Sequence, residues 1–421
     1  MGIALMMLAA SVAVFGQSAI YHFKGGADGN WPMATMVADA AGNLYGTTYE
    51  GGGSTKCGGA KNYPFGCGIV FELTPPASRT GPWTETVLYR FTDGLDGALP
   101  SGGVTLDQAG NLYGTTSWGG TLGDGTIYQL VPPATQGGSW TEYTIYNFSV
   151  SQNGYDFPYY LAVDKSGNLY GYGGATYGGV FQLAPPVAQG GGWTYNLLYS
   201  FQGGSTDGSF PLGGPVLDAE GNIYGATDDG GNPACGSGCG VIFKLEPPAT
   251  QGGAWTEKVL YSFKGMPDGN YPLDSLMIGA NGNLYGTTSR GGQYGATYGG
   301  YGTVFELAKP GQSGGAWTET VLYSFQDDGD GGGPTGGVVH DNAGNLYGRD
   351  SSTVFRISPP SAQGGIWTET TLYNLANLQG LGEDDAGLTL RPKSGTLYGT
   401  TQGGGICTQR ECLGTVFSVE P

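Results

Sequence analysis

The sequence is poor in charged residues, and the charge it carries is mostly of one sign. Lys, Arg, Asp and Glu make up 12% of its 421 residues, about half of the roughly 25% that is typical of soluble domains. Acidic residues number 34 and basic residues 16, which gives a formal net charge of −18. Such an excess repels phosphate backbones, so we exclude nucleic acid as a partner and expect cations or basic surfaces to be favoured.

The sequence also lacks long apolar runs. The stretch over residues 1–15 is too short to span a bilayer comfortably, and it resembles the apolar core of a secretory signal even though no Lys or Arg precedes it. We predict a signal peptide over residues 1–17 and an exported domain over residues 18–421, with no membrane span in the mature chain. A retained, lipid-facing anchor is the alternative.

Enzymatic signatures are missing as well. The sequence contains no Gly-x-Ser-x-Gly elbow, no His-Glu-x-x-His site and no phosphate-binding loop. With only two histidines, the six cysteines favour disulfides over metal ligation in an exported chain. The predicted disulfides join Cys57 to Cys67, Cys235 to Cys239, and Cys407 to Cys412. Paired carboxylates for glycoside chemistry stay open, because a sequence does not show which carboxylates are close in space.

Glycine is abundant, and it is periodic. Gly-Asn-Leu-Tyr-Gly or a close variant occurs seven times, beginning at residues 42, 110, 167, 221, 282, 344 and 395. The chain also contains 28 Tyr, 16 Phe and 8 Trp, far too many for a disordered glycine-rich chain. The period therefore indicates a repeat architecture.

Each repeat contains four segments with the composition of short β-strands. We name them a (Trp-Thr-Glu to Phe), b (ending in Asp), c (Leu-Tyr-Gly-Thr-Thr) and d (Val-Phe-x-Leu). Asp-x-x-Gly-Asn between b and c predicts a tight hairpin turn that the Asp side chain caps. Four antiparallel strands repeated seven times predict an all-β fold, a seven-bladed β-propeller, and a β-solenoid is the less favoured alternative.

The two ends of the chain predict how the ring closes. Residues 20–23 match the end of a segment a, and residues 416–421 match a segment d. If b is the innermost strand and a the outermost, the last blade must take its outer strand from residues 19–23. Closure of this kind leaves no sheet edge free.

Strand direction places the a–b and c–d loops on one face and the b–c turns and d–a connections on the other. The first face, which we call the loop face, holds the cysteine pairs and the Asp-Gly-x-x-Pro loops. We predict that it is an acidic binding face, with candidate binding residues Asp28, Asp96, Asp207, Asp268 and Asp330. No cofactor is required. Ca²⁺ ligation by these carboxylates is one interpretation, and ordinary turn chemistry, which we favour, is the other.

Departures from the repeat are further candidates for a site. Segment b carries His340 where an apolar residue is usual, either as an acid–base group or as a structural histidine. Aromatic residues in the variable loops, including Trp118 and Tyr298, are suited to stacking on sugar rings or to local packing. We add Trp118, Tyr298 and His340 to the candidate binding residues and assign no catalytic residue.

The combined motif is similar to that of a known family. Phe-x-x-x-x-Asp-Gly-x-x-Pro, Gly-Asn-Leu-Tyr-Gly-Thr-Thr-x-x-Gly-Gly and Gly-Thr-Val-Phe together resemble the tandem repeat of the choice-of-anchor GloVer-containing proteins. The resemblance covers residues 20–421. It implies an exported bacterial protein, often surface-anchored, with no established activity or catalytic residues. The Asp-x-x-Gly-Asn-Leu-Tyr element is also similar to that of NHL-type propellers, which supports placing b innermost.

These observations favour a secreted or cell-surface propeller with a non-enzymatic binding or scaffold function. Its expected partner is an extracellular or cell-surface protein or a carbohydrate. Two alternatives stay open: a polysaccharide-acting propeller enzyme (hydrolase or lyase), and a structural subunit of an extracellular assembly. The oligomeric state does not follow from the sequence.

Overall fold

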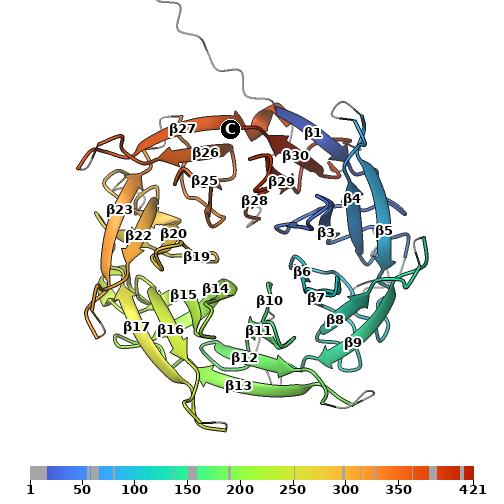
Figure 1. Cartoon of the computed structure of the whole chain (residues 1–421), viewed down its shortest axis with the longest axis horizontal. Helices are drawn as coiled ribbons and strands as arrows, with labels where there is room; N and C mark the ends of the chain where they lie inside the picture. Colours follow the sequence, from blue (N-terminus) through green and yellow to red (C-terminus); the bar gives the residue numbers. More distant parts are fainter. Residues whose placement is uncertain are drawn as a thin grey trace, which may run out of the picture.

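The computed structural model is a ring of seven four-stranded antiparallel sheets around a central axis (Figure 1). The predicted seven-bladed β-propeller is therefore confirmed, and each blade has b as its inner strand, then c, d and a outward. The structure describes residues 17–54, 57, 66–78, 81–135, 137–149, 159–187, 191–250, 252–295, 299–312, 314–326, 329–362, 364–378, 386–407 and 412–421.

The strands recur at the same places in every blade. The inner b strands are β2 (Val37–Ala38), β6 (Thr105–Leu106), β10 (Ala162–Val163), β14 (Gly208–Leu217), β19 (Met277–Ile278), β24 (Val339–His340) and β28 (Thr389–Leu390). The c strands are β3 (Leu44–Thr48), β7 (Leu112–Thr116), β11 (Leu169–Tyr172), β15 (Ile223–Gly230), β20 (Leu284–Thr288), β25 (Leu346–Arg349) and β29 (Leu397–Thr401). The d strands are β4 (Ile69–Thr74), β8 (Thr126–Val131), β12 (Gly179–Ala184), β16 (Val241–Glu246), β22 (Thr303–Ala308), β26 (Thr353–Ser358) and β30 (Thr415–Val419).

The outer a strands complete the blades. They are β5 (Thr84–Arg90), β9 (Thr141–Asn147), β13 (Thr194–Ser200), β17 (Thr256–Ser262), β23 (Thr318–Ser324), β27 (Thr368–Asn374) and β1 (Gln17–His22). The fifth blade also carries a small ladder of β18 (Gly269–Asn270) with β21 (Arg290–Gly291). In the part of the chain that the structure describes, two short 3-10 helices lie in loops, η1 (Pro233–Cys235) and η3 (Leu375–Leu378).

The first strand closes the ring, as predicted. β1 pairs antiparallel with β30, with Ser18 opposite Ser418 and His22 opposite Thr415, and the two strands lie side by side in Figure 1. Phe23, just after β1, is fully buried and contacts the ring of Phe71 in the first blade at 5.2 Å between centroids. The last blade is thus built from both ends of the chain.

The repeated residues are explained by packing within and between blades. The glycine of Leu-Tyr-Gly lies under the aromatic ring of strand d, so that a Cβ on Gly46 would come within 2.7 Å of Phe71 Cζ. The tryptophan that begins an outer strand packs edge-on against the c-strand tyrosine of the preceding blade, as Trp140 does on Tyr45 and Trp193 on Tyr113. Glycine and the aromatics of the repeat therefore build the platform.

The loop face is held together across blade boundaries. The three predicted disulfides are present, each within a c–d loop. Residues before the a–b proline donate their N–H to the preceding blade's c–d loop, as Leu99 does to Cys67 O at 2.8 Å and Phe210 to Tyr177 O at 2.8 Å. These residues take positive φ (Trp31 59°, Leu99 55°, Phe210 57°, Tyr271 57°), a costly conformation for bulky side chains, and the interblade hydrogen bond offsets part of that cost.

Candidate functional site

The five candidate aspartates of the a–b loops lie at the outer strands. Each accepts a hydrogen bond from the hydroxyl of the tyrosine that precedes its loop, at 2.7–3.1 Å, and from a backbone N–H of the loop. The tyrosine–aspartate pairs are Tyr21–Asp28, Tyr89–Asp96, Tyr199–Asp207, Tyr261–Asp268 and Tyr323–Asp330. Because each carboxylate is held on its own outer strand, the structure does not bring the five together. They order the loops, and a binding role for them stays a prediction.

Half-buried glutamates lie next to four of these aspartates. Burial, together with the nearby aspartate carboxylate, raises the pKa of Glu85, Glu142, Glu257 and Glu319 to about 7. Within the described ranges no three His, Cys, Asp or Glu side chains form a group that could hold a metal ion. Ca²⁺ binding by the loop face remains a prediction.

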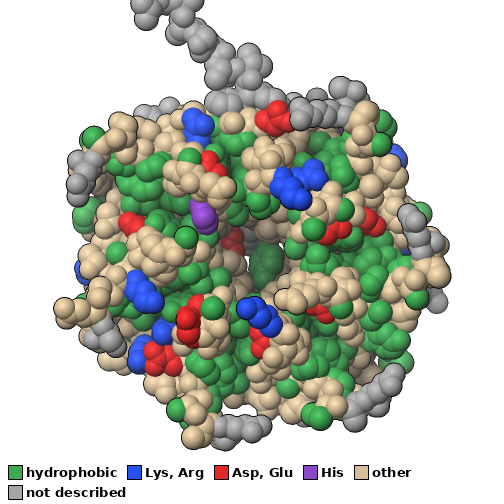
Figure 2. Space-filling model, viewed as in Figure 1, with side chains coloured by type: hydrophobic (Ala, Val, Ile, Leu, Met, Phe, Trp, Pro, Cys, Tyr) green, Lys and Arg blue, Asp and Glu red, His purple; other side chains and the backbone are tan. Residues whose placement is uncertain are grey.

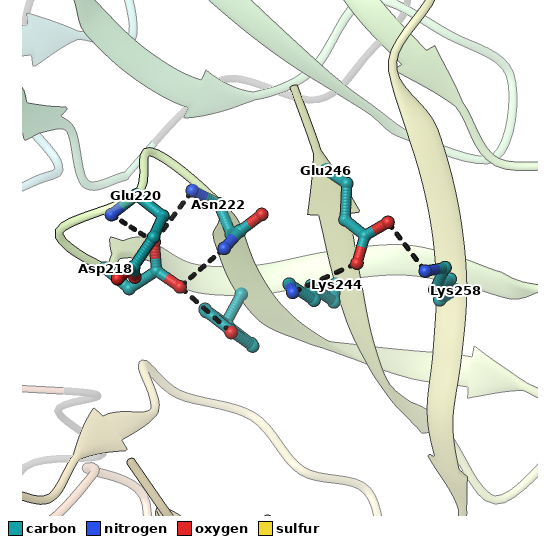
Figure 3. A network of polar contacts seen from close by, with 7 residues as sticks. Asp218, Glu220, Asn222, Lys244, Glu246 and Lys258 are labelled. Carbon is teal, nitrogen blue, oxygen red and sulfur yellow. Dashed lines mark hydrogen bonds and ion pairs between the residues drawn. The ribbon is translucent and has the colours of Figure 1, made fainter. Parts of the chain in front are cut away.

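The aspartate of the b–c turn is a second structural carboxylate, shown for the fourth blade in Figure 3. Asp218 accepts hydrogen bonds from the backbone N–H groups of Glu220 and Asn222, from Asn222 Nδ2 at 2.7 Å and from the Tyr224 hydroxyl at 3.1 Å. Burial opposes ionisation of Asp218, but these donors outweigh it and lower its pKa. The predicted capped turn is confirmed. Nearby, Glu246 pairs with Lys244 on its own strand β16 and with Lys258 on the neighbouring strand β17.

Substituting Asp218→Ala should lower the free energy of unfolding by about 3 kcal/mol, because four donors lose a charged acceptor. Chemical denaturation followed by tryptophan fluorescence measures this. Glu220→Ala is the matched control: only its backbone N–H joins the network, so it should change stability by less than about 0.5 kcal/mol. Equal losses for the two variants would contradict the assigned role.

Around the axis, seven residue pairs, one from each blade, form a continuous ring, which we call the axial ring. Each pair precedes the inner strand of its blade, except in the fourth blade, where it lies within the longer β14. Its seven pairs are Ala34–Thr35, Gly102–Gly103, Tyr159–Tyr160, Gly213–Gly214, Asp274–Ser275, Gly336–Gly337 and Ala386–Gly387. Neighbouring pairs touch. The N–H of Gly214 donates to Ser275 Oγ at 2.7 Å, and that of Gly387 donates to Thr35 Oγ1 at 2.6 Å. Glycine is required where the ring is tightest, since a Cβ on Gly102 would collide with the backbone oxygen of Tyr159.

The axial ring is where the repeat is broken. Three blades have Gly-Gly at these positions, whereas the first, third and fifth place Thr35, Tyr160 and the pair Asp274–Ser275 there. The Asp274 carboxylate accepts hydrogen bonds from the N–H groups of Ser275 and Gly337, both at 2.5 Å. The structure thus gathers polar groups from different blades at the axis. Sequence reasoning missed Asp274, Thr35 and Ser275. An alignment of the seven repeats at the Gly-Gly positions of the second, fourth and sixth blades would have shown these residues as exceptions.

Exposed apolar side chains gather on the loop face. Of the thirteen large exposed hydrophobic side chains in the described part of the chain, eight lie in a–b or c–d loops or in the axial ring, and a ninth, Phe210, lies at the loop-face end of β14. They are Leu95, Trp118, Leu122, Tyr159, Tyr177, Phe210, Met266, Tyr294 and Ile406. Trp118 is 47% exposed, and Tyr177 contacts Phe210 across the boundary between the third and fourth blades at 6.2 Å between ring centroids. Tyr298, the other aromatic candidate, is outside the described residues.

The opposite face, formed by the b–c turns and d–a connections and seen in Figure 2, is hollowed at the axis. His340 ends inner strand β24 on this side, exposed, with Nδ1 3.0 Å from the backbone oxygen of Asp341. It lies away from the aspartates and from Trp118, so the predicted binding residues do not form one site. No helix in the described ranges is long and apolar enough to cross a membrane.

A cavity of about 1210 Å³ lies at the closing seam, between β1, the d–a connection of the first blade and the last b–c turn. Its lining combines Trp83 with charges of both signs, including Asp341, Arg391 and Lys393. Trp83 packs on Tyr398 as the equivalent tryptophans do in other blades, at 5.5 Å between ring centroids. The aromatic wall of this cavity is thus part of the repeat, and we assign it no role.

The repeat itself identifies the family. A model of the Gloeobacter/Verrucomicrobia repeat matches residues 53–295 and, in a second overlapping match, residues 172–417. The chain belongs to this repeat family. The two matches together cover most of the propeller, which confirms the resemblance to GloVer-containing proteins. Comparison with curated proteins gives no match.

Solved structures share the fold of this Gloeobacter/Verrucomicrobia repeat protein at low identity. The extracellular domain of a protein described as a hybrid two-component system of B. thetaiotaomicron is 16% identical with a TM-score of 0.55, over 97% of this chain and 42% of that one. The polysaccharide lyase Uly1 is 12% identical with a TM-score of 0.50, over 95% and 92% of the two chains. These likenesses show the fold alone, so the repeat protein's own residues must carry any functional argument.

Proposed function

We propose that this repeat-family propeller is an exported, non-enzymatic binding protein that holds a carbohydrate on its loop face. The observation that carries the proposal is the gathering of nine of the thirteen exposed large hydrophobic side chains, among those described, on that face. Soluble proteins rarely concentrate apolar surface in this way without a partner. Five of the nine are Trp, Tyr or Phe, whose rings stack on the apolar faces of sugars.

The chemistry around these rings supports a sugar over other partners. In the loop of Trp118, for example, Ser117, Thr121 and Asp124 bring hydroxyl and carboxylate groups that match the polar edges of a saccharide. The repeated carboxylates are already bound to tyrosine hydroxyls and backbone N–H groups. Three disulfides support export, because they persist in oxidising compartments.

Affinity electrophoresis against a panel of neutral and anionic polysaccharides, followed by titration calorimetry, tests this function. Trp118→Ala and Tyr177→Ala should each weaken binding about tenfold, since exposed aromatics at such surfaces are typical anchors. Ile366→Ala is the control, because Ile366 is 85% exposed but lies on a d–a connection of the other face.

Three results would count against the proposal. Failure of every polysaccharide to retard the protein would contradict carbohydrate binding, and an equal loss for Ile366→Ala would contradict the assignment to the loop face. Release of reducing or unsaturated ends from any panel member would show that the propeller is an enzyme instead.

A further inference from the structure

The axial ring carries polar side chains that its architecture does not require. The second, fourth and sixth blades have glycine pairs at the ring positions, so the fold forms there without side chains. Blades one, three and five instead supply Thr35, Tyr160, Asp274 and Ser275. Thr35, Asp274 and Ser275 each accept a backbone N–H from another blade, contacts that the blades with glycine pairs do without.

The side chains of blades five and one meet across a glycine of blade seven. Asp274 Oδ2 is bound to Gly337 N and would lie 3.7 Å from a Cβ built on Gly387. Thr35 Oγ1 accepts the N–H of Gly387 and would lie 3.2 Å from the same Cβ. The carboxylate and hydroxyl oxygens therefore lie within about 7 Å of one another near the axis. Hydroxyls of a single sugar ring can reach both oxygens.

These groups are also accessible. Thr35, Tyr160, Asp274 and Ser275 are all partly exposed, although they belong to the innermost layer of the ring. A side chain at that radius meets solvent only along the axis, so solvent reaches the ring from a face of the propeller. Tyr159, beside Tyr160, is 51% exposed and connects the ring to the aromatic surface of the loop face.

The chemistry of the ring favours an uncharged ligand. None of its fourteen residues is Lys or Arg, and its one charged member is the Asp274 carboxylate. In a chain of net charge −18, this arrangement repels anionic sugars. A carboxylate accepts up to about four hydrogen bonds, so it can bind ligand hydroxyls in addition to its backbone donors.

We propose that the axial ring is the subsite for the terminal residue of a neutral saccharide. Asp274 accepts hydrogen bonds from one or two sugar hydroxyls, while the Thr35 and Ser275 hydroxyls bind neighbouring oxygens. The polar groups of Asp274, Thr35 and Ser275 lie in the one innermost layer of the ring, which contacts one sugar residue of a chain. This inference rests on the proposed carbohydrate-binding function and names the part of the site that would select the ligand.

Titration calorimetry with neutral tetra- to hexasaccharides of glucose, xylose and mannose tests the subsite. Asp274→Asn keeps the side-chain shape and a carbonyl oxygen for Gly337 N, although its NH₂ group cannot accept the N–H of Ser275. It should weaken binding about 10- to 100-fold, as expected when a charged acceptor is lost. Gly387→Ala places a methyl group between Asp274 and Thr35 and should weaken binding at least as much. Gly192→Ala, where a Cβ meets nothing within 4 Å, is the matched control and should bind normally.

The outcomes separate the two proposals. If Trp118→Ala and Tyr177→Ala lose binding while Asp274→Asn and Gly387→Ala keep it, the axial subsite is wrong and the loop-face function stands. If no saccharide binds the unaltered chain, both are wrong. A CaCl₂ titration whose heat disappears in Asp274→Asn, without saccharide binding, would make the ring a cation site instead. Melting temperatures of all variants confirm that a loss of binding is not a loss of fold.

Discussion

A chain that starts at Lys24 should fail to form a stable propeller, whereas a chain that starts at Gln17 should fold. Removing residues 17–23 deletes the outer strand of the last blade, leaves the edge of β30 unpaired, and removes the fully buried Phe23 from the cluster around Phe71. An open edge of this kind also invites aggregation. Size-exclusion chromatography and calorimetric melting of the two chains measure the effect.

A point variant distinguishes the effect of losing strand β1 from the effect of losing the Phe23 side chain. Phe23→Ala in the chain from Gln17 should lower the free energy of unfolding by about 3–5 kcal/mol and leave a closed monomer, because β1 still pairs with β30. A chain from Lys24 that melts cooperatively at the same temperature as the chain from Gln17 would show that closure by β1 does not stabilise the ring.

Stability should fall as the pH rises from about 5 to 8. Glu85, Glu142, Glu257 and Glu319 have pKa values of about 7 in the fold, against an ordinary value of 4.5. Between those two values the folded state binds more protons than the unfolded state, so the free energy of unfolding decreases with pH across that window and levels off above it. After allowance for solvent screening, each glutamate contributes about 1 kcal/mol, or about 4 kcal/mol together.

Melting temperatures measured across this pH range, at constant ionic strength, show how stability depends on pH. A variant with all four glutamates replaced by glutamine should lose most of this pH dependence, since an uncharged amide replaces each half-buried carboxyl. Its substitutions are Glu85→Gln, Glu142→Gln, Glu257→Gln and Glu319→Gln. A pH profile that is equally steep in the variant would mean that other groups are responsible. Aspartates such as Asp218, whose pKa is lowered, act only at lower pH and do not interfere.

Much of the fold follows from local patterns. The b–c turn was predictable because Asp218 and its equivalents bind donors only two, four and six residues away, so the interaction is contained in one short motif. The disulfides were predictable because their partners are four to ten residues apart in sequence. Ring closure was predictable because β1 and β30 carry two halves of one repeat.

The candidate site follows less directly from local patterns. The aspartates of the a–b loops are predicted binding residues; Asp96 and Asp207 are bound to outer-strand tyrosines and are almost fully buried, and their binding role stays a prediction. A residue's distance from the axis depends on how the strands of a blade are ordered in space, which a list of motifs does not state. Asp274 was overlooked for the same reason, since Asp-Ser in one loop has no meaning until seven such loops meet.

The sequence by itself determined the number of blades, the order of strands within them, the disulfides and the strand that closes the ring. Each of these depends on contacts within one repeat or between neighbouring copies of the same motif. Only the tertiary structure decided which departures from the repeat converge. Thr35, Tyr160 and Asp274 are separated by more than a hundred residues in the chain, and it is the curvature of seven packed sheets that brings them to one axis.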